Sequence, residues 1–301
     1  MNNKRRLFST VLCVAALTAG LFVSGCGSDK AGGIGSVVSS VVDGGDEKAA
    51  AKLNTLIDAT NRFNSDNASF AEFQAEGLAK LKGGFAEGAI TNQPHFDRLQ
   101  ADLEKAKKEG STFKEVDAER DNVLNILNEL VPVYKDLTAY DDSKAYMNDG
   151  GAKGKELAAK YVAAVEKFDV AYAKFNEVLN KVNAEQSKKQ IEKLKKDGKK
   201  GYAAAMESTL RLTTLVDNLE KAPQKADKAA VEKELSEIEA LLKSINNDRG
   251  QVLAERYNSV VGDVRQVLAD PSDNNLNNMI QGFNGYIDTY NSTTPDQFDA
   301  K

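Results

Sequence analysis

The stretch that decides the fold reads LAAKYVAAVEKFDVAYAKFNEVLNKV and covers residues 157–182. Its large apolar residues recur at spacings of four and three, which places them on one face of a helix. The residues of this stripe are Leu157, Tyr161, Val165, Phe168, Tyr172, Phe175, Leu179 and Val182. Because a helix buries such a stripe by packing it against other helices, the pattern predicts a helical bundle.

The same spacing returns along the rest of the chain and predicts further helices. The additional stripes are Leu53, Leu56, Ile57, Thr60 and Phe63; Val231, Leu235, Ile238, Leu242 and Ile245; Leu253, Tyr257, Val260, Val264 and Val267; and Leu276, Ile280, Phe283, Ile287 and Tyr290. No segment alternates with period two for long enough to be a strand. We therefore predict an all-α fold, an elongated bundle of long amphipathic helices, in one helical domain over residues 46–301.

Glycine, proline and capping residues predict where these helices begin and end. Breaks are expected from Gly83 to Pro94, near Gly110, between Tyr140 and Gly151, at Pro223 and, more weakly, at residues 246–250. Starts are expected at the capping boxes of residues 69–72 and 112–115 and at Asp270, which precedes a proline. Residues 183–201 hold seven lysines and few large apolar residues, so this segment either bends or continues the helix. One helix over residues 152–221 would be about 100 Å long.

The N-terminus has the pattern of a secretory signal. Lys4, Arg5 and Arg6 precede an apolar run over residues 7–23, and small residues then precede Cys26. The sequence VSGC at residues 23–26 fits a bacterial lipobox, in which the cysteine receives diacylglycerol and its new amine a fatty acid such as palmitate. The alternative, an uncleaved transmembrane helix, is weakened by the short length and polar residues of the run. We predict a signal peptide over residues 1–25, a glycine- and serine-rich tether over residues 26–45, and lipid attachment at Cys26.

The overall composition agrees with a helix-rich protein outside the nucleic-acid-binding classes. The chain has 301 residues, 28% of them charged, and a formal net charge of −5. Nucleic-acid-binding domains are usually basic, so no nucleic-acid partner is predicted. Gly27 follows Cys26, where an aspartate would favour retention in the inner membrane of a Gram-negative cell. By that analogy we expect the outer membrane, facing the periplasm, or otherwise the outer face of the cytoplasmic membrane.

A polar motif occurs twice. NTLIDATN at residues 54–61 and NGYIDTYN at residues 284–291 both fit Asn-x-x-Ile-Asp-x-x-Asn. On a helix the polar residues form a stripe at the border of the buried face. The stripe residues are Asn54, Asp58, Asn61, Asn284, Asp288 and Asn291. Such residues either fix the register of neighbouring helices through hydrogen bonds, which we favour, or hold a polar ligand or cation.

The segment YDDSKAYMNDGGAKGKEL at residues 140–157, together with the NTLIDATN opening, resembles a family of uncharacterised bacterial lipoproteins. The family is typified by YiiG and defined by a domain of unknown function. The resemblance implies a lipoprotein location and a helical domain, and it implies no activity. A histidine is expected in the family soon after the Gly-Lys pair, whereas Ala158 stands there in this chain, so no role is carried over.

Motifs for catalysis and metal binding are sparse. One histidine, His95, cannot build the usual zinc clusters. Residues 111–114 fit S-x-x-K and residues 272–274 fit S-D-N, but K-T-G and a sheet are missing. We therefore predict no catalytic residue, metal or cofactor. A tyrosine- and aspartate-rich group remains a candidate ligand surface: Tyr140, Asp141, Asp142, Tyr146 and Asp149.

These patterns favour a lipid-anchored, non-enzymatic envelope protein that binds or scaffolds another component. Membrane lipid, through Cys26, and an envelope protein or glycan are the expected partners. The lysines of residues 183–201 either form a solvated helix face, which we favour, or contact anionic lipid or glycan. The alternatives are a periplasmic ligand-binding or chaperone-like module with a cleft near residues 140–157, and a hydrolase with a carboxylate site.

Overall fold

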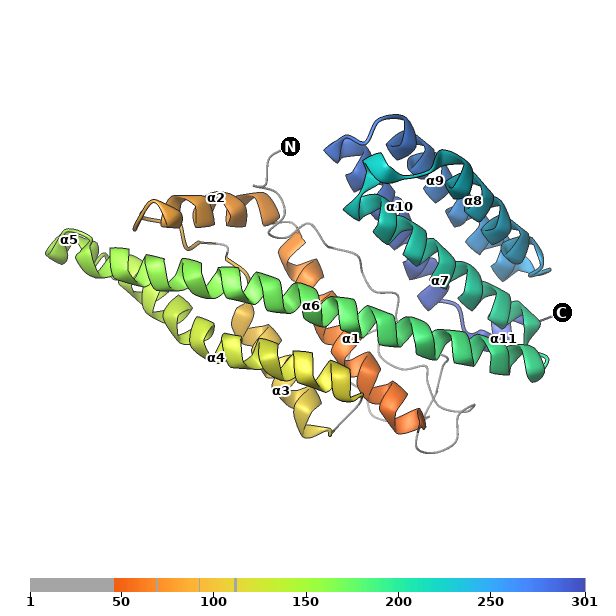
Figure 1. Ribbon diagram of the computed structural model, residues 1–301, viewed down its shortest axis with the longest axis horizontal. Coiled ribbons are helices and arrows are strands. Elements are labelled where there is room, and N and C mark those ends of the chain that lie inside the picture. The colour runs from red at the N-terminus through yellow and green to blue at the C-terminus, as the bar shows by residue number, and fades with distance from the viewer. Residues whose placement is uncertain (1–45, 69, 92, 111–112, 301) are drawn as a thin grey trace. The chain divides into compact units, whose positions relative to one another are not determined.

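The computed structural model describes residues 46–68, 70–91, 93–110 and 113–300. Every regular element within these ranges is a helix, which confirms the all-α prediction (Figure 1). The described residues divide into two compact units, the first formed by residues 55–182 and the second by residues 183–300 together with residues 46–54. The signal, the lipobox, Cys26 and the tether lie outside the described residues, so these assignments stay predictions.

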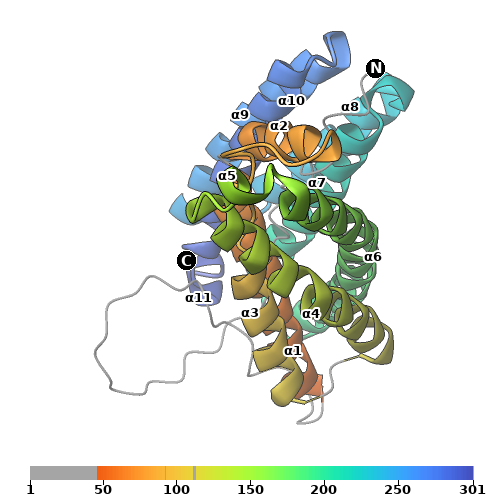
Figure 2. The ribbon, with the colours of Figure 1, turned by 90° about the vertical axis from the view of Figure 1, so that its left-hand side faces the viewer.

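The first unit contains four complete helices, the end of α1 from residue 55 and the beginning of α6. They are α1 (Asp46–Ala68), α2 (Ala71–Lys82), α3 (Phe96–Lys108), α4 (Lys114–Asp142), α5 (Tyr146–Asp149) and α6 (Ala152–Lys196), of which residues 152–182 belong here. α4 runs beside the first half of α6 in both ribbon views (Figures 1 and 2). The tight turns around α5 bring these two long helices into a hairpin.

Aromatic rings fill the centre of the first unit. Phe96 and Phe168 meet edge to face with ring centroids 5.0 Å apart, and Phe63 meets Tyr172 at 5.3 Å. All predicted stripe residues of α6 are buried except Tyr172, which is partly exposed. The Tyr172 hydroxyl donates a hydrogen bond to Asn64 Oδ1 at 3.0 Å, so this ring packs apolar atoms inward and satisfies its polar end.

The second unit is built on a four-helix bundle. Its elements are the end of α6, α7 (Lys200–Lys221), the 3₁₀ helix η2 (Pro223–Lys225), α8 (Lys228–Lys243), α9 (Asp248–Ala269), α10 (Asp273–Asn291) and α11 (Pro295–Phe298). α7 packs on α8, α8 on α9, α9 on α10, and α10 on α7, which closes the ring. The predicted stripes of α8 and α9 are fully buried in this core. Tyr286 also lies inside, with its hydroxyl 3.2 Å from Ser208 Oγ and 3.1 Å from Thr209 Oγ1.

The C-terminal segment is fastened to the start of α7. Gly201 and Tyr202 donate backbone hydrogen bonds to the two carboxylate oxygens of Asp299, at 2.7 and 3.4 Å. Phe298 is 2% exposed and stacks between Tyr202 and Tyr290. Since Lys199, the N-cap residue of α7, provides no side-chain cap, Asp299 supplies the acceptor for this helix start. We call residues 295–300 the C-terminal clamp.

One helix boundary that the sequence leaves open is decided by the structure, and three predicted helix starts are corrected. Residues 152–221 are two helices, because α6 ends at Lys196 and Gly198 adopts a left-handed φ of 79°. Glycine takes this conformation without steric cost, and the turn is closed by a 2.9 Å bond from Lys199 N–H to the Leu194 carbonyl. The start of α10 is capped by Ser272 and not by Asp270, so the helix begins after Pro271. α2 and α4 begin at Ala71 and Lys114, one residue later than the capping boxes imply; Ser69 and Thr112 lie outside the described residues.

Candidate functional site

Asp149 is the centre of the polar group predicted from the sequence. It is the last residue of α5 and accepts hydrogen bonds from Tyr140 Oη at 2.6 Å, Gly151 N–H at 2.9 Å and Lys153 N–H at 3.1 Å. The hydrogen bond from Tyr140 holds the pKa of Asp149 below its usual range, and burial raises the pKa of Tyr140. A carboxylate placed in this way caps the first turn of α6 and ties that helix to α4.

Gly154 explains the Ala-Lys-Gly-Lys run in the same segment. A Cβ at this position would lie 2.5 Å from Tyr140 Cε1 and 2.6 Å from Phe85 Cγ. The Phe85 ring meets Tyr140 edge to face at 5.1 Å and lies 5.3 Å from the Tyr146 ring. Glycine is therefore the residue that lets α6 approach this aromatic cluster.

The loop before α3 completes the arrangement. Gly88 donates its N–H to Asp141 Oδ2 at 2.9 Å, and a hydrogen bond to Glu87 raises the pKa of Tyr146 to about 12. Four of the five predicted residues, Tyr140, Asp141, Tyr146 and Asp149, thus join internal contacts around Phe85. Asp142 and Asp149 are exposed. Sequence reasoning missed Phe85 and Glu87, whose only signal was an aromatic residue within a glycine-rich loop. These contacts favour a packing role for the segment.

The repeated Asn-x-x-Ile-Asp-x-x-Asn motif lies at the border of the buried face in both copies. Ile57 and Thr60 are fully buried, while Asn54, Asp58 and Asn61 are half-buried. Burial raises the pKa of Asp58 to about 6, partly offset by Arg62.

The second copy has the same arrangement. Ile287 and Tyr290 are buried, Asn284 and Asn291 are half-buried, and Asp288 is exposed. Asp58 and Asn61 belong to the first unit, whereas Asn54 and residues 284–291 belong to the second.

Two further carboxyl groups have strongly raised pKa values. Burial, with the neighbouring charge of Glu166, raises the pKa of Asp169 to about 7. Burial, with Asp217, raises the pKa of Glu220 to about 8. Paired catalytic carboxylates shift one another's pKa values. Here the charges that act on Asp169 and Glu220 come from neighbours on the same helix and, for Asp169, also from Lys82. The raised values therefore record burial of single carboxyls.

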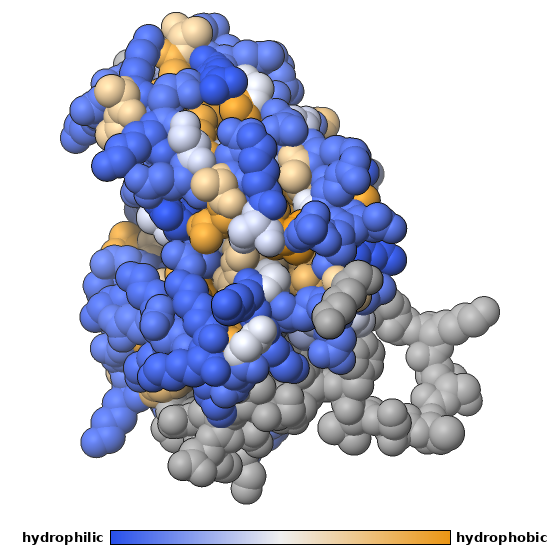
Figure 3. All heavy atoms as spheres, turned by 90° about the vertical axis from the view of Figure 1, so that its right-hand side faces the viewer, coloured by the Kyte–Doolittle hydropathy of each residue, from blue (hydrophilic) through white to orange (hydrophobic). Residues whose placement is uncertain are grey.

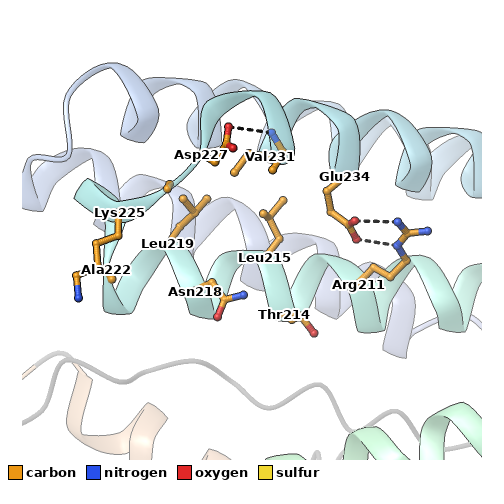
Figure 4. A pocket seen from close by; sticks show the side chains of 12 residues that line it. Arg211, Thr214, Leu215, Asn218, Leu219, Ala222, Lys225, Asp227, Val231 and Glu234 are labelled. Carbon is orange, nitrogen blue, oxygen red and sulfur yellow. Dashed lines mark hydrogen bonds and ion pairs between the residues drawn. The ribbon is translucent and has the colours of Figure 1, made fainter.

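A groove of about 510 Å³ runs between α7 and α8 (Figure 4). Leu215, Leu219 and Val231 form its apolar floor. Arg211 stands at one end and donates to both carboxylate oxygens of Glu234, at 2.7 and 2.8 Å. Asp227 lies at the other end and caps α8 by accepting the N–H of Ala229 at 2.9 Å. The groove combines an apolar base with charged ends, a composition that suits small amphiphilic molecules.

The remaining sequence expectations concern metals and membranes. Within the described ranges, no three His, Cys, Asp or Glu side chains gather closely enough to hold a metal ion. His95 is exposed and stands directly before α3. Among the described helices, each is too short or too polar to cross a bilayer.

The fold and this site define a helical protein of two units, in which the segment at residues 140–157 holds α4 and α6 together as a hairpin. Residues 47–269 match the profile of a family described as "Protein of unknown function (DUF3829)", and the chain belongs to this family. No curated protein and no solved structure matches the chain. The matched region contains the residue 140–157 segment and ends with α9, so α10 and α11 follow it.

Proposed function

We propose that this protein is a lipid-anchored component of the bacterial envelope that binds or scaffolds a partner and does not catalyse a reaction. The lipobox VSGC at residues 23–26 supports the anchor. In that chemistry the Cys26 sulfur takes a diacylglyceryl group from a phospholipid, whose phosphorylated headgroup leaves with the thiol proton. The amine freed by cleavage then takes an acyl group from a second phospholipid, which leaves as the lysophospholipid. Several acyl chains give durable attachment. The segment at residues 140–157 resembles the YiiG-like lipoproteins, which also favours an envelope lipoprotein.

The hydrogen bonds of the Asp149 carboxylate are the observation that supports a non-enzymatic role. A carboxylate that serves as acid, base or nucleophile needs a free oxygen facing a substrate. Asp149 instead receives a phenol and two backbone N–H groups, all within 3.1 Å. Tyr140 and Asp149 thus bind each other, and Asp141 and Tyr146 bind Gly88 and Glu87. These internal contacts favour a structural use of this segment and leave the helix surfaces for partners.

Replacing Cys26 with serine tests the anchor in the native host. The wild-type chain should fractionate with membranes and show, by mass spectrometry, cleavage before Cys26 and an added diacylglyceryl and acyl mass. The Cys26→Ser chain should carry no lipid and keep its first 25 residues. An unmodified thiol on the wild-type chain would refute the anchor. Photocrosslinking in the intact envelope then tests the partner: a specific protein or glycan supports scaffolding, and recovery of bulk phospholipid alone contradicts it.

The groove between α7 and α8 favours a second candidate, a periplasmic ligand-binding module. The chain has no tryptophan, so Thr214→Trp places a single fluorescent reporter on the groove wall. Octanoate should shift its emission in a saturable way. Val252→Trp, at an exposed position on α9, is the matched control and should not respond. Equal responses, or no response, in the two variants would exclude fatty-acid binding in the groove.

A further inference from the structure

Positive charge in the second unit is concentrated where α6 meets α7. Residues 183–200 contain seven lysines and three acidic residues, a net charge of 7 − 3 = +4. Residues 201–301 contain ten basic and sixteen acidic residues, a net charge of 10 − 16 = −6. The end of α6 and the start of α7 therefore form a basic end on an otherwise acidic unit.

Most of these lysines have no carboxylate partner. Lys195 pairs with Glu207 at 2.8 Å, and Lys199 with Asp296 at 3.6 Å. The other five form no ion pair with any part of the chain that the structure describes, and we call them the lysine tip: Lys188, Lys189, Lys193, Lys196 and Lys200. By contrast, the lysines nearer the start of α6 at positions 160, 167 and 174 each have a carboxylate within 3.9 Å.

The lysine tip presents its charges to one side. With 100° per residue, its four members on α6 fall within an arc of about 140° and span about 12 Å along the axis. Lys188, Lys189, Lys196 and Lys200 are exposed, and Lys193 is half-buried. Figure 3 views the molecule from the right-hand side of Figure 1, where the α6–α7 turn lies, and most of the residues coloured on that face are hydrophilic.

Helix stability accounts for only part of this pattern. Lys193 and Lys196 stand in the last turn of α6, where a cation interacts favourably with the helix dipole. Lys188 and Lys189 precede that turn. Lys200 is the first residue of α7, where a positive charge is unfavourable, and the first turn of α7 has no acidic residue. The tip therefore carries charges that do not stabilise its own helices.

We propose that the lysine tip binds the anionic headgroups of a phospholipid surface and holds the second unit against it. The proposal rests on the proposed function, because an acylated Cys26 would keep the chain at a membrane. Basic residues near an anionic bilayer each strengthen binding about fivefold, and the effect falls off within a Debye length. The C-terminal clamp fastens the start of α7, which carries Lys200, to the start of α9.

Vesicle binding of a non-acylated chain tests the tip separately from the anchor. The chain from residue 26 onward, with Cys26→Ser, keeps all described residues and cannot be acylated. Cosedimentation with vesicles of phosphatidylcholine and phosphatidylglycerol is compared with phosphatidylcholine alone. Binding should require phosphatidylglycerol and weaken at high salt. Lys189→Gln, Lys193→Gln and Lys196→Gln together should reduce it about 100-fold.

The control removes the same charge from the same helix. It combines Lys160→Gln, Lys167→Gln and Lys174→Gln, and binding should remain within about twofold of the unsubstituted chain. Circular dichroism verifies that both triple variants stay helical. Three results would overturn the proposal: no preference for phosphatidylglycerol, undiminished binding of the tip variant, or equal losses in the two triple variants. Failure to find lipid on Cys26 would refute the anchor without altering these vesicle results.

Discussion

Replacing Gly201 with alanine should unfasten the C-terminal clamp. The added Cβ would lie 2.1 Å from the Phe298 carbonyl oxygen and 2.9 Å from its carbonyl carbon, whereas ordinary contacts begin near 3.4 Å. Both atoms belong to the backbone, so the clamp must move by more than 1 Å. The movement would lengthen the Asp299 hydrogen bonds, a loss of about 1–2 kcal/mol, and expose part of Phe298, a loss of up to about 3 kcal/mol.

Alanine also favours helix over glycine by up to about 1 kcal/mol, so the expected net loss of unfolding free energy is about 2–3 kcal/mol. Urea denaturation followed by circular dichroism measures it, and hydrogen exchange at the Tyr202 amide should quicken. Gly262→Ala on α9 is the matched control, because a Cβ there meets nothing within 4 Å. The control should stabilise the protein by about 0.5–1 kcal/mol. The reasoning is refuted if Gly201→Ala raises stability as much as the control does.

Three further predictions concern the first unit. Gly154→Ala should lower the unfolding free energy by up to about 2 kcal/mol in urea denaturation, because its methyl group collides with Tyr140 and Phe85; an unchanged midpoint would contradict the packing role. Asp149→Ala should cost about 1–2 kcal/mol and lower the pKa of Tyr140, followed by NMR, whereas Asp149→Asn should keep most of the cap; equal losses would argue against capping. Burial raises the pKa of Asp169 from 3.8 to about 7, so the folded protein binds this proton more tightly than the unfolded chain and stability should fall as pH rises from about 4 to about 7. Asp169→Asn should flatten that dependence and stabilise the protein at pH 8 by about 2–4 kcal/mol, and an unchanged dependence in the variant would show that the group is not buried as described.

The helices were predictable because burial imposes a period that the sequence records directly. The spacing of Leu157, Tyr161 and Val165 reports which face of α6 is inside, and all three are buried. The turn at Gly198 was not decidable from the same information, since a glycine weakens a helix without having to end it. The cap on the helix start that follows the turn comes from Asp299, which bonds to Gly201 across 98 positions of sequence. Local patterns do not reveal a partner at that separation.

Only those contacts of the candidate site that join residues close in sequence were predictable. Asp149 followed by two glycines indicates a helix start, and Tyr140 lies close enough in sequence to be grouped with it. The contacts that turn this group from a surface into a packed cluster come from Phe85 and Gly88, more than fifty positions earlier. Because nothing in the local sequence of residues 140–157 specifies that loop, the segment resembled a ligand surface.

The region that matches the family profile ends before the folded region does. Family similarity stops at residue 269, yet α10 inserts five buried side chains into the second unit beyond that point. Withdrawing five large apolar side chains from water contributes on the order of 10 kcal/mol, which is comparable to the whole stability of a typical domain. A gene fragment that encodes only residues 47–269 would therefore yield a chain that exposes the apolar faces of α7 and α9 and aggregates. Expression of this protein, or comparison with its relatives, should extend through Ala300, where the last described bond to Asn247 is made.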